Sequence, residues 1–186
     1  MKANEIRNGT VLLYNKVPYK VMSFMHHTPG NLRAMVQTKL RNLLNGSQTE
    51  VRFSSTEDIP EADVFSFAAT YLYSDGETYH FMNSTNYEEI AINKTVIADA
   101  IYYVQEQMQV MVTSYNGEPI GIELPKTVTL TVIDTAPELR GATASNSPKP
   151  AKTDTGLQLT VPTFIKIGDK IVVNTEEGKY LSRAES

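Results

Sequence analysis

The chain has 186 residues, of which 41% are hydrophobic, and its 17 basic and 21 acidic side chains leave a formal net charge of −4. Its longest apolar run, Ala100 to Val104, is far shorter than the ~18 residues of a membrane span, so no membrane association is expected. The first residues lack the apolar core of a secretion signal and the chain has no cysteine, which favours a cytoplasmic protein.

Charge is distributed unevenly along the chain. Residues 1–53 carry eight basic and two acidic side chains, whereas residues 64–126 carry two basic and eight acidic ones. A basic first third favours binding to phosphate, and an acidic middle repels RNA unless it faces away or contacts protein. The alternative is chance variation of charge along a solvated surface.

The spacing of turn residues predicts an all-β protein. Runs rich in Val, Ile, Thr, Tyr and Phe alternate with Gly, Asn, Asp and Pro about every ten residues, as in sandwiches and small barrels. A polar run ends near Asp63 and suggests one domain boundary, and a second boundary is suggested near Lys126. We therefore predict three small β domains, at residues 1–63, 64–126 and 127–186.

The segment from His26 to Arg41 predicts a β-hairpin. Pro29 and Gly30 suit the two central positions of a type II turn, which places the tip near Asn31. The return strand alternates between a polar, basic face and an apolar face. The expected outward residues are Arg33, Met35, Gln37, Lys39 and Arg41, and the expected inward residues are Ala34, Val36, Thr38 and Leu40.

A basic ladder on a projecting hairpin is suited to following a nucleic-acid backbone, because Lys and Arg neutralise phosphates without reading sequence. About eight strand residues on each side would carry the tip roughly 25 Å from its base. A solvated face on an ordinary hairpin remains the alternative at this stage.

No motif indicates catalysis or a metal site. Adjacent residues in a strand project to opposite faces, so His26 and His27 make a poor chelating pair, and His80 is the one further histidine. The chain lacks a nucleophile elbow, a Gly-rich phosphate loop and a cysteine nucleophile. The sequence therefore predicts no enzyme, no metal and no cofactor.

Residues 93–108 break the β pattern and predict one short amphipathic helix with Asn93 as its cap. Its apolar residues are expected to pack on a barrel: Ile97, Ala100, Ile101, Val104 and Met108. Further on, Pro137 to Gly156 is expected to be a long loop inside the third domain, between the strand-like segments Thr127–Asp134 and Leu157–Val161.

Residues 149–168, KPAKTDTGLQLTVPTFIKIG, match the signature of the bacterial elongation factor P family at each of its fixed positions. Other stretches also resemble that family: Lys39–Leu43, Thr70–Glu77, His80–Asn83, Val132–Thr135 and Tyr180–Arg183. The resemblance extends over nearly the whole chain.

The resemblance implies an N-terminal KOW/SH3-like barrel followed by two OB-fold barrels. It further implies a monomeric translation factor that binds the bacterial ribosome, through ribosomal RNA and proteins, between the peptidyl and exit sites. There it would steady peptidyl-tRNA and its CCA end and promote peptide-bond formation at consecutive prolines, by orientation and not by chemistry of its own.

The resemblance also implies site residues. The tip loop near the peptidyl-transferase centre would be Pro29, Gly30, Asn31, Leu32 and Arg33. Contacts to the RNA backbone would come from Lys39, Arg41, Tyr180 and Arg183. A third-domain loop facing the exit-site codon would be Gly141, Ala142, Thr143, Ala144 and Ser145. The alternative is that Tyr180 and Arg183 have no RNA contact: Tyr180 would belong to a capped final strand and Arg183 would be solvated.

Two of these sites depart from the family pattern. Many members have Pro-Gly-Lys-Gly at the tip, with a lysine that is enzymatically extended, and others have a glycosylated arginine; here Asn31 takes that position and suits neither modification. We expect an unmodified tip in which Arg33 supplies the cation. In the third-domain loop, Ala142 and Ser145 replace the aspartate and second glycine of the usual Gly-Asp-Thr-Ala-Gly.

Two other readings stay open. The elongation factor P-like paralogue would share the fold and the ribosome. A general OB-fold RNA-binding protein would instead bind single strands through exposed aromatic rings. Against that reading, the alternating aromatics Tyr71, Tyr73, Tyr79 and Phe81 are expected to belong to the core.

Overall fold

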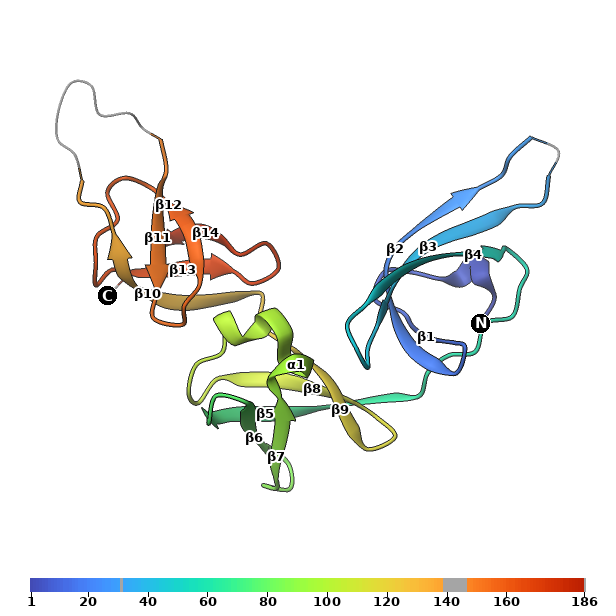
Figure 1. Ribbon diagram of the computed structural model, residues 1–186, viewed down its shortest axis with the longest axis horizontal. Helices are drawn as coiled ribbons and strands as arrows, with labels where there is room; N and C mark the ends of the chain where they lie inside the picture. The colour runs from blue at the N-terminus through green and yellow to red at the C-terminus, as the bar shows by residue number, and fades with distance from the viewer. Residues whose placement is uncertain (31, 139–146, 186) are drawn as a thin grey trace. The chain divides into compact units, whose positions relative to one another are not determined.

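The computed structural model describes residues 1–30, 32–138 and 147–185, and strands make up most of its regular structure (Figure 1). The predicted all-β class is thereby confirmed. Within the described ranges, no helix is long and apolar enough to cross a membrane.

The chain divides into two compact units. One comprises Met1–Phe67 and Val112–Gly121, and the other comprises Ala68–Met111 and Ile122–Ser186. The three-domain division at Asp63 and Lys126 stays a prediction, because the two units do not test it.

The first sheet has the order β1-β2-β3-β4. Its strands are β1 (Val11–Tyr14), β2 (Val17–His27), β3 (Met35–Asn42) and β4 (Gln48–Ser54). A short 3-10 turn, η1 (Ala3–Glu5), precedes them. The inward side chains of Leu12, Val21, Val36, Leu40 and Phe53 form one hydrophobic cluster, which gives this sheet its own core.

The middle sheet has the order β7-β6-β5-β8-β9. Its strands are β5 (Val64–Ser74), β6 (Thr78–Asn83), β7 (Glu89–Asn93), β8 (Gln109–Tyr115) and β9 (Glu118–Glu123). Between β7 and β8 the chain forms α1 (Lys94–Ile97) and the 3-10 segment η2 (Ala98–Tyr102).

The predicted helix of residues 93–108 is wrong in length, although its cap is confirmed. Asn93 Oδ1 accepts a hydrogen bond from Thr95 N at 2.9 Å, as an N-cap residue does. The α-helix ends at Ile97 because Ala98 has a φ of +52°, outside the right-handed helical region. Beyond η2, the side chain of Tyr103 packs into the hydrophobic cluster of the last sheet.

The last sheet has the order β12-β11-β10-β13-β14. Its strands are β10 (Thr127–Thr135), β11 (Lys149–Thr153), β12 (Gln158–Val161), β13 (Lys170–Asn174) and β14 (Lys179–Arg183). The loop predicted from Pro137 to Gly156 therefore contains a strand. Pro150 lies in this strand, β11, opposite Thr160 of β12. The Pro150 carbonyl accepts a hydrogen bond from Thr135 Oγ1 at 2.9 Å.

Candidate nucleic-acid interface

The hairpin formed by β2 and β3 has the two faces predicted from its sequence. Val36, Thr38 and Leu40 are at most 1% exposed, whereas Lys39 is exposed. The Cα register runs from Val21 opposite Leu40 to His27 opposite Met35. The alternation in β3 thus buries its apolar side chains in the core and turns its cations outward.

The hairpin is reinforced by β4 along the whole of β3. The pairing extends from Arg41 opposite Gln48 to Met35 opposite Ser54. The paired strands end at His27 and Met35, so the tip loop begins where three adjacent strands end together. Such backing holds the base of the tip more firmly than a two-stranded ribbon would, because isolated hairpins are only marginally stable in water.

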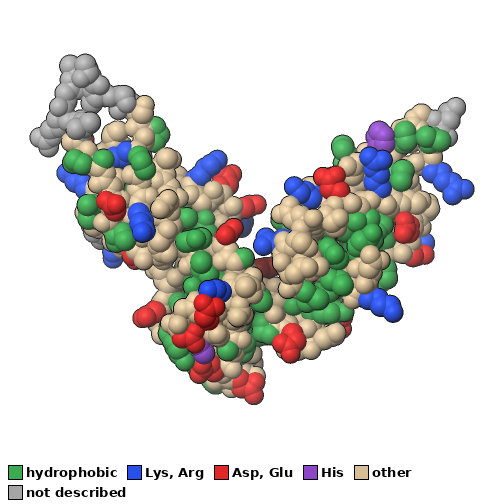
Figure 2. All heavy atoms as spheres, viewed as in Figure 1, with side chains coloured by type: hydrophobic (Ala, Val, Ile, Leu, Met, Phe, Trp, Pro, Cys, Tyr) green, Lys and Arg blue, Asp and Glu red, His purple; other side chains and the backbone are tan. Residues whose placement is uncertain are grey.

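The outer face of this sheet carries two cations that the sequence reading did not select. Lys20 lies opposite Arg41 on β2, and Arg52 lies opposite Gln37 on β4. Side chains that are opposite each other in register share a face, so Lys20, Lys39, Arg41 and Arg52 form one group, here called the basic face. Figure 2 shows Lys and Arg side chains gathered along this hairpin. The period-two pattern of β4 could have revealed Arg52.

The cations of the basic face are not paired with carboxylates of the described residues, although Glu50 lies among them. In the described part of the chain, none of these four cations forms an ion pair or a side-chain hydrogen bond. Glu50 lies opposite Lys39 on this face, and its Oε2 accepts a hydrogen bond from Gln37 Nε2 at 3.5 Å without forming an ion pair with Lys39. Unpaired cations on a regular strand spacing are available to phosphate groups.

The tip turn differs from the predicted type II geometry. Leu32 N donates to Pro29 O at 2.8 Å, so Pro29 is the first residue of the turn and Gly30 is the second. Gly30 has a φ of +46°, which turns of the primed types require at this position and which glycine adopts without strain. Asn31 lies outside the described residues.

The side chains after the turn point to solvent. Leu32 is 71% exposed and Arg33 is also exposed. Arg33 has no ion pair or side-chain hydrogen bond with any residue that the structure describes. The tip thus presents one apolar and one cationic side chain to solvent.

The two histidines before the tip lie on opposite faces, as predicted. His26 is opposite the buried Val36 and His27 is opposite Met35. The ring of His26 makes an edge contact with Phe24, with 5.6 Å between the centroids. No group of His, Asp and Glu residues in the described ranges has the arrangement of a metal site.

The two C-terminal candidates have different environments. Tyr180 is half-buried and packs against the hydrophobic cluster of the last sheet, and this burial raises its pKa. Arg183 at the end of β14 is exposed, with its Nη2 at 3.9 Å from Asp169 Oδ1. Arg183 is therefore the better placed of the two for a partner, whereas Tyr180 serves packing. The exit-site-facing loop, residues 141–145, lies outside the described residues.

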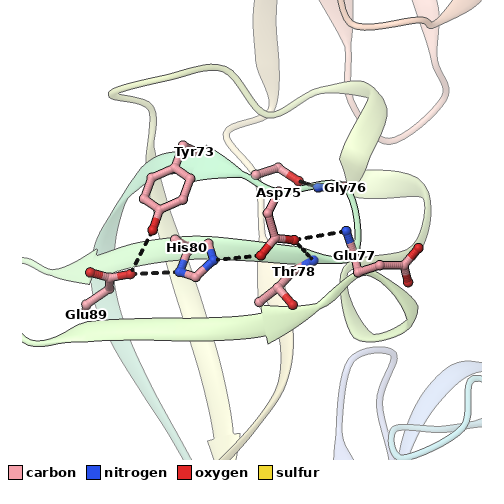
Figure 3. A network of polar contacts seen from close by, with 8 residues as sticks. Tyr73, Asp75, Gly76, Glu77, Thr78, His80 and Glu89 are labelled. Atoms are coloured by element: carbon pink, nitrogen blue, oxygen red, sulfur yellow. Dashed lines mark hydrogen bonds and ion pairs between the residues drawn. The ribbon is translucent and has the colours of Figure 1, made fainter.

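A polar network on the middle sheet was missed by the sequence reading (Figure 3). The ring of Tyr73 stacks on His80 with 4.4 Å between centroids. His80 Nδ1 lies 2.7 Å from Glu89 Oε1, and its Nε2 lies 3.5 Å from Asp75 Oδ2. Asp75 also accepts backbone hydrogen bonds from Thr78 and Glu77, which lower its pKa below the ordinary 3.8.

The network also corrects the prediction that Tyr73 is a core residue, since its side chain is 48% exposed. The register of β5 and β6 shifts between Tyr71 and Tyr73, so Tyr71 pairs with Phe81 but Tyr73 pairs with His80. This bulge reverses the alternation and turns Tyr73 outward. Tyr71 and Phe81 are buried as predicted, at 7% and 0% exposure.

Three family models together match nearly the whole chain. The KOW-like domain of elongation factor P matches residues 2–59, its OB domain matches residues 68–122, and its C-terminal domain matches residues 128–183. The predicted fold class, a KOW-like barrel followed by OB-type barrels, is confirmed.

Curated proteins named elongation factor P are similar over their full lengths. The protein from Acidobacterium capsulatum is 45% identical over 182 residues, which cover 98% of both chains. The protein from Gemmatimonas aurantiaca is 43% identical, covering 98% of this chain and 97% of its own. That from Thermotoga maritima is 42% identical, covering 99% and 100%.

A solved structure supports the fold alone. Eukaryotic translation initiation factor 5A from Methanococcus jannaschii aligns with a TM-score of 0.53 at 14% identity, covering 67% of this chain and 93% of its own. With the matching domains, the full-length relatives and this likeness of fold in agreement, the chain belongs to the elongation factor P family.

Proposed function

We propose that this protein is a cytoplasmic translation elongation factor that binds the bacterial ribosome between the peptidyl and exit sites. There it steadies peptidyl-tRNA and promotes peptide-bond formation at consecutive prolines. The observation that carries the proposal is the unpaired basic face at the foot of an exposed tip loop. Membership of the family favours the ribosome as the partner. The basic face offers cations that could bind the phosphates of its RNA.

The division of labour within the hairpin follows from its chemistry. The basic face neutralises RNA phosphates without reading sequence, and so sets the position of the hairpin. The tip then supplies Arg33, whose guanidinium donates hydrogen bonds in a fixed plane, to the CCA end of the tRNA. Restricting the motion of peptidyl-tRNA lowers the barrier to peptide-bond formation, and the protein itself carries out no chemical step.

Ribosome profiling with and without the protein tests this function. We expect pauses on removal of the protein to be confined to codons for consecutive prolines. Pauses spread over unrelated codons, or no change in pausing, would contradict the proposal. The second outcome is the one that a general RNA-binding protein would produce.

Arg33→Ala tests the role of the tip. We expect rescue of a polyproline reporter to fall roughly tenfold, equivalent to about 1.4 kcal/mol of lost orientation, in a strain lacking the native protein. Lys126→Ala, which removes an exposed cation outside the hairpin, is the control and should leave rescue unchanged. Full rescue by Arg33→Ala would show that another group supplies the contact.

The state of the tip can be measured independently. Because Asn31 is no substrate for lysine extension or arginine glycosylation, we expect the peptide spanning the tip, isolated from the natural host, to have its unmodified mass. Any added mass on that peptide contradicts this assignment but leaves the ribosomal role standing.

A further inference from the structure

The second compact unit contains a cleft of about 520 Å³ beside η2. Two tyrosine rings, two carboxylates and two neutral polar side chains contribute to its lining: Tyr71, Tyr79, Glu106, Asp154, Gln105 and Thr155. None of the described residues that line it is a lysine or an arginine. The cleft is remote in sequence from the hairpin and plays no part in the function proposed above.

The hydroxyl of Tyr71 is the first sign that the cleft is built to hold a ligand. The Tyr71 side chain is 7% exposed and lines the cleft, and its hydroxyl forms no hydrogen bond with any residue in the described ranges. No buried side-chain nitrogen or oxygen of these residues lacks a partner, so this hydroxyl reaches solvent and is open to a ligand in the cleft. Burial, with Tyr79 and Glu106 adding to it, raises the pKa of Tyr71, so the phenol stays neutral and can both donate and accept.

The remaining polar groups define what the ligand must offer. Gln105 Nε2 already donates to Thr129 O, and Thr155 Oγ1 donates to Tyr102 O, both at 2.6 Å. Asp154 Oδ1 accepts from Thr131 N at 3.2 Å, which leaves its second oxygen for the cleft. The Thr155 hydroxyl and one N–H of Gln105 are therefore occupied, whereas the Glu106 carboxylate has no partner among the described residues. Because two carboxylates line the cleft and no described lining residue is a lysine or an arginine, the cleft favours a cationic ligand.

The aromatic side favours a flat cation. The rings of Tyr71 and Tyr79 lie 5.9 Å apart at an interplanar angle of 29°, in a stacked arrangement. A guanidinium group is planar, stacks on aromatic rings, is more weakly hydrated than an ammonium group and donates to carboxylates through a fork. RNA is disfavoured here because its phosphates would meet Glu106 and Asp154.

We propose that this cleft binds the guanidinium group of an arginine side chain presented by a protein partner. The two carboxylates would receive its N–H donors while the Tyr71 hydroxyl accepts a further hydrogen bond. The lining comes from β5 and β6, from η2 and the segment that follows it, and from the turn after β11, all in one compact unit, so occupation of the cleft would also tie these segments together.

Titration of the full chain with N-acetyl-arginine N-methylamide tests this, read from the backbone amide NMR signals. We expect saturable shifts centred on Tyr71, Gln105 and Thr155, and weaker binding of the matching lysine derivative. A short peptide containing one arginine should shift the same signals. No saturable shift, equal binding of lysine, or a response to the derivative but not to the peptide would each overturn the proposal.

Variants identify the groups responsible. The double variant Glu106→Gln, Asp154→Asn should weaken binding about tenfold, and the Asn should retain the acceptor for Thr131 N and hence the fold. The control double variant Glu88→Gln, Glu123→Gln removes the same charge from exposed positions and should bind normally. Tyr71→Phe should weaken binding about threefold. Unchanged affinity in the first variant would overturn the assignment.

Discussion

At the residue scale, Gly178 is the described glycine at which an added Cβ would stand nearest to another atom. It lies in the turn between β13 and β14 with a φ of +67°, and a Cβ there would stand 2.8 Å from the hydroxyl of Tyr103. Tyr103 is 8% exposed and belongs to the core of the last sheet, so its ring has little room to retreat. The glycine therefore serves both the turn and the close packing of Tyr103.

Gly178→Ala should lower the free energy of unfolding for two reasons, backbone strain and a steric clash. Gly117 provides a matched control, since its φ is +80° but nothing lies within 4 Å of its added Cβ. We expect Gly117→Ala to cost about 1 kcal/mol and Gly178→Ala to cost about 1–3 kcal/mol more. Urea unfolding followed by circular dichroism measures both. Equal losses would mean that the Tyr103 contact is absent.

A second residue-scale prediction concerns acid stability and Asp75. Its pKa is lowered chiefly by the backbone hydrogen bonds of Thr78 and Glu77, so in the folded state it holds its proton less readily than when unfolded. The resulting stabilisation is present above the ordinary pKa of 3.8 and is lost as the pH falls through the lower folded-state value.

Asp75→Asn keeps a hydrogen-bond acceptor but cannot ionise, so stability should depend less steeply on pH below about 4 than in the unaltered chain. Urea midpoints measured from pH 5 to pH 2 show this slope. Glu123→Gln, at an exposed position, is the control. The ¹³C titration of the Asp75 carboxyl should have its midpoint below 3.8; a midpoint above that value would contradict the assigned hydrogen bonds.

At the scale of elements, the basic face should make ribosome binding depend on salt. Each phosphate contact contributes a slope of about −0.7 to −0.9 to a plot of log affinity against log salt concentration. Lys39→Gln with Arg41→Gln should weaken binding and make the slope less negative by roughly two such contacts.

The single variants Lys20→Gln and Arg52→Gln should each reduce the same slope by about one contact, because register places them on the basic face. Lys94→Gln is the control, since that lysine lies in α1, outside the basic face, and is paired with Glu77. If the salt slope is unaltered in both Lys20→Gln and Arg52→Gln, only the cations of β3 contact RNA phosphates.

At the scale of the whole molecule, the separate cores predict that the chain does not unfold as one unit. Leu40 and Leu130 are each fully buried, the first in the core of the β1-β2-β3-β4 sheet and the second in the core of the last sheet. Leu→Ala at either position should cost about 2–5 kcal/mol.

Hydrogen exchange of the backbone amides distinguishes the two variants. Leu40→Ala should reduce protection in β2 and β3 and leave β10 and β13 unchanged, and Leu130→Ala should do the reverse. Uniform loss of protection in both variants would show that the two compact units unfold cooperatively.

Sequence alone determined those features of this protein that depend on local chemistry. The alternation of β3 predicted which side chains are buried because a strand has a strict period of two. The Asn93 cap was also predictable because it depends on residues near in sequence: the Asn93 side chain accepts a hydrogen bond from the backbone N–H of Thr95. The signature in residues 149–168 indicated the family that the domain matches confirm.

Tertiary structure decided the features that depend on distant partners. The bulge after Tyr71 reverses the faces of β5, and the pairing that creates it is not visible in a single strand. The α-helix ends at Ile97, where Ala98 has a φ of +52°, and Tyr103 further along packs in the core of the last sheet. Lys20 and Arg52 join Lys39 and Arg41 only through the register of β2 and β4, because side chains far apart in sequence become neighbours when their backbones pair.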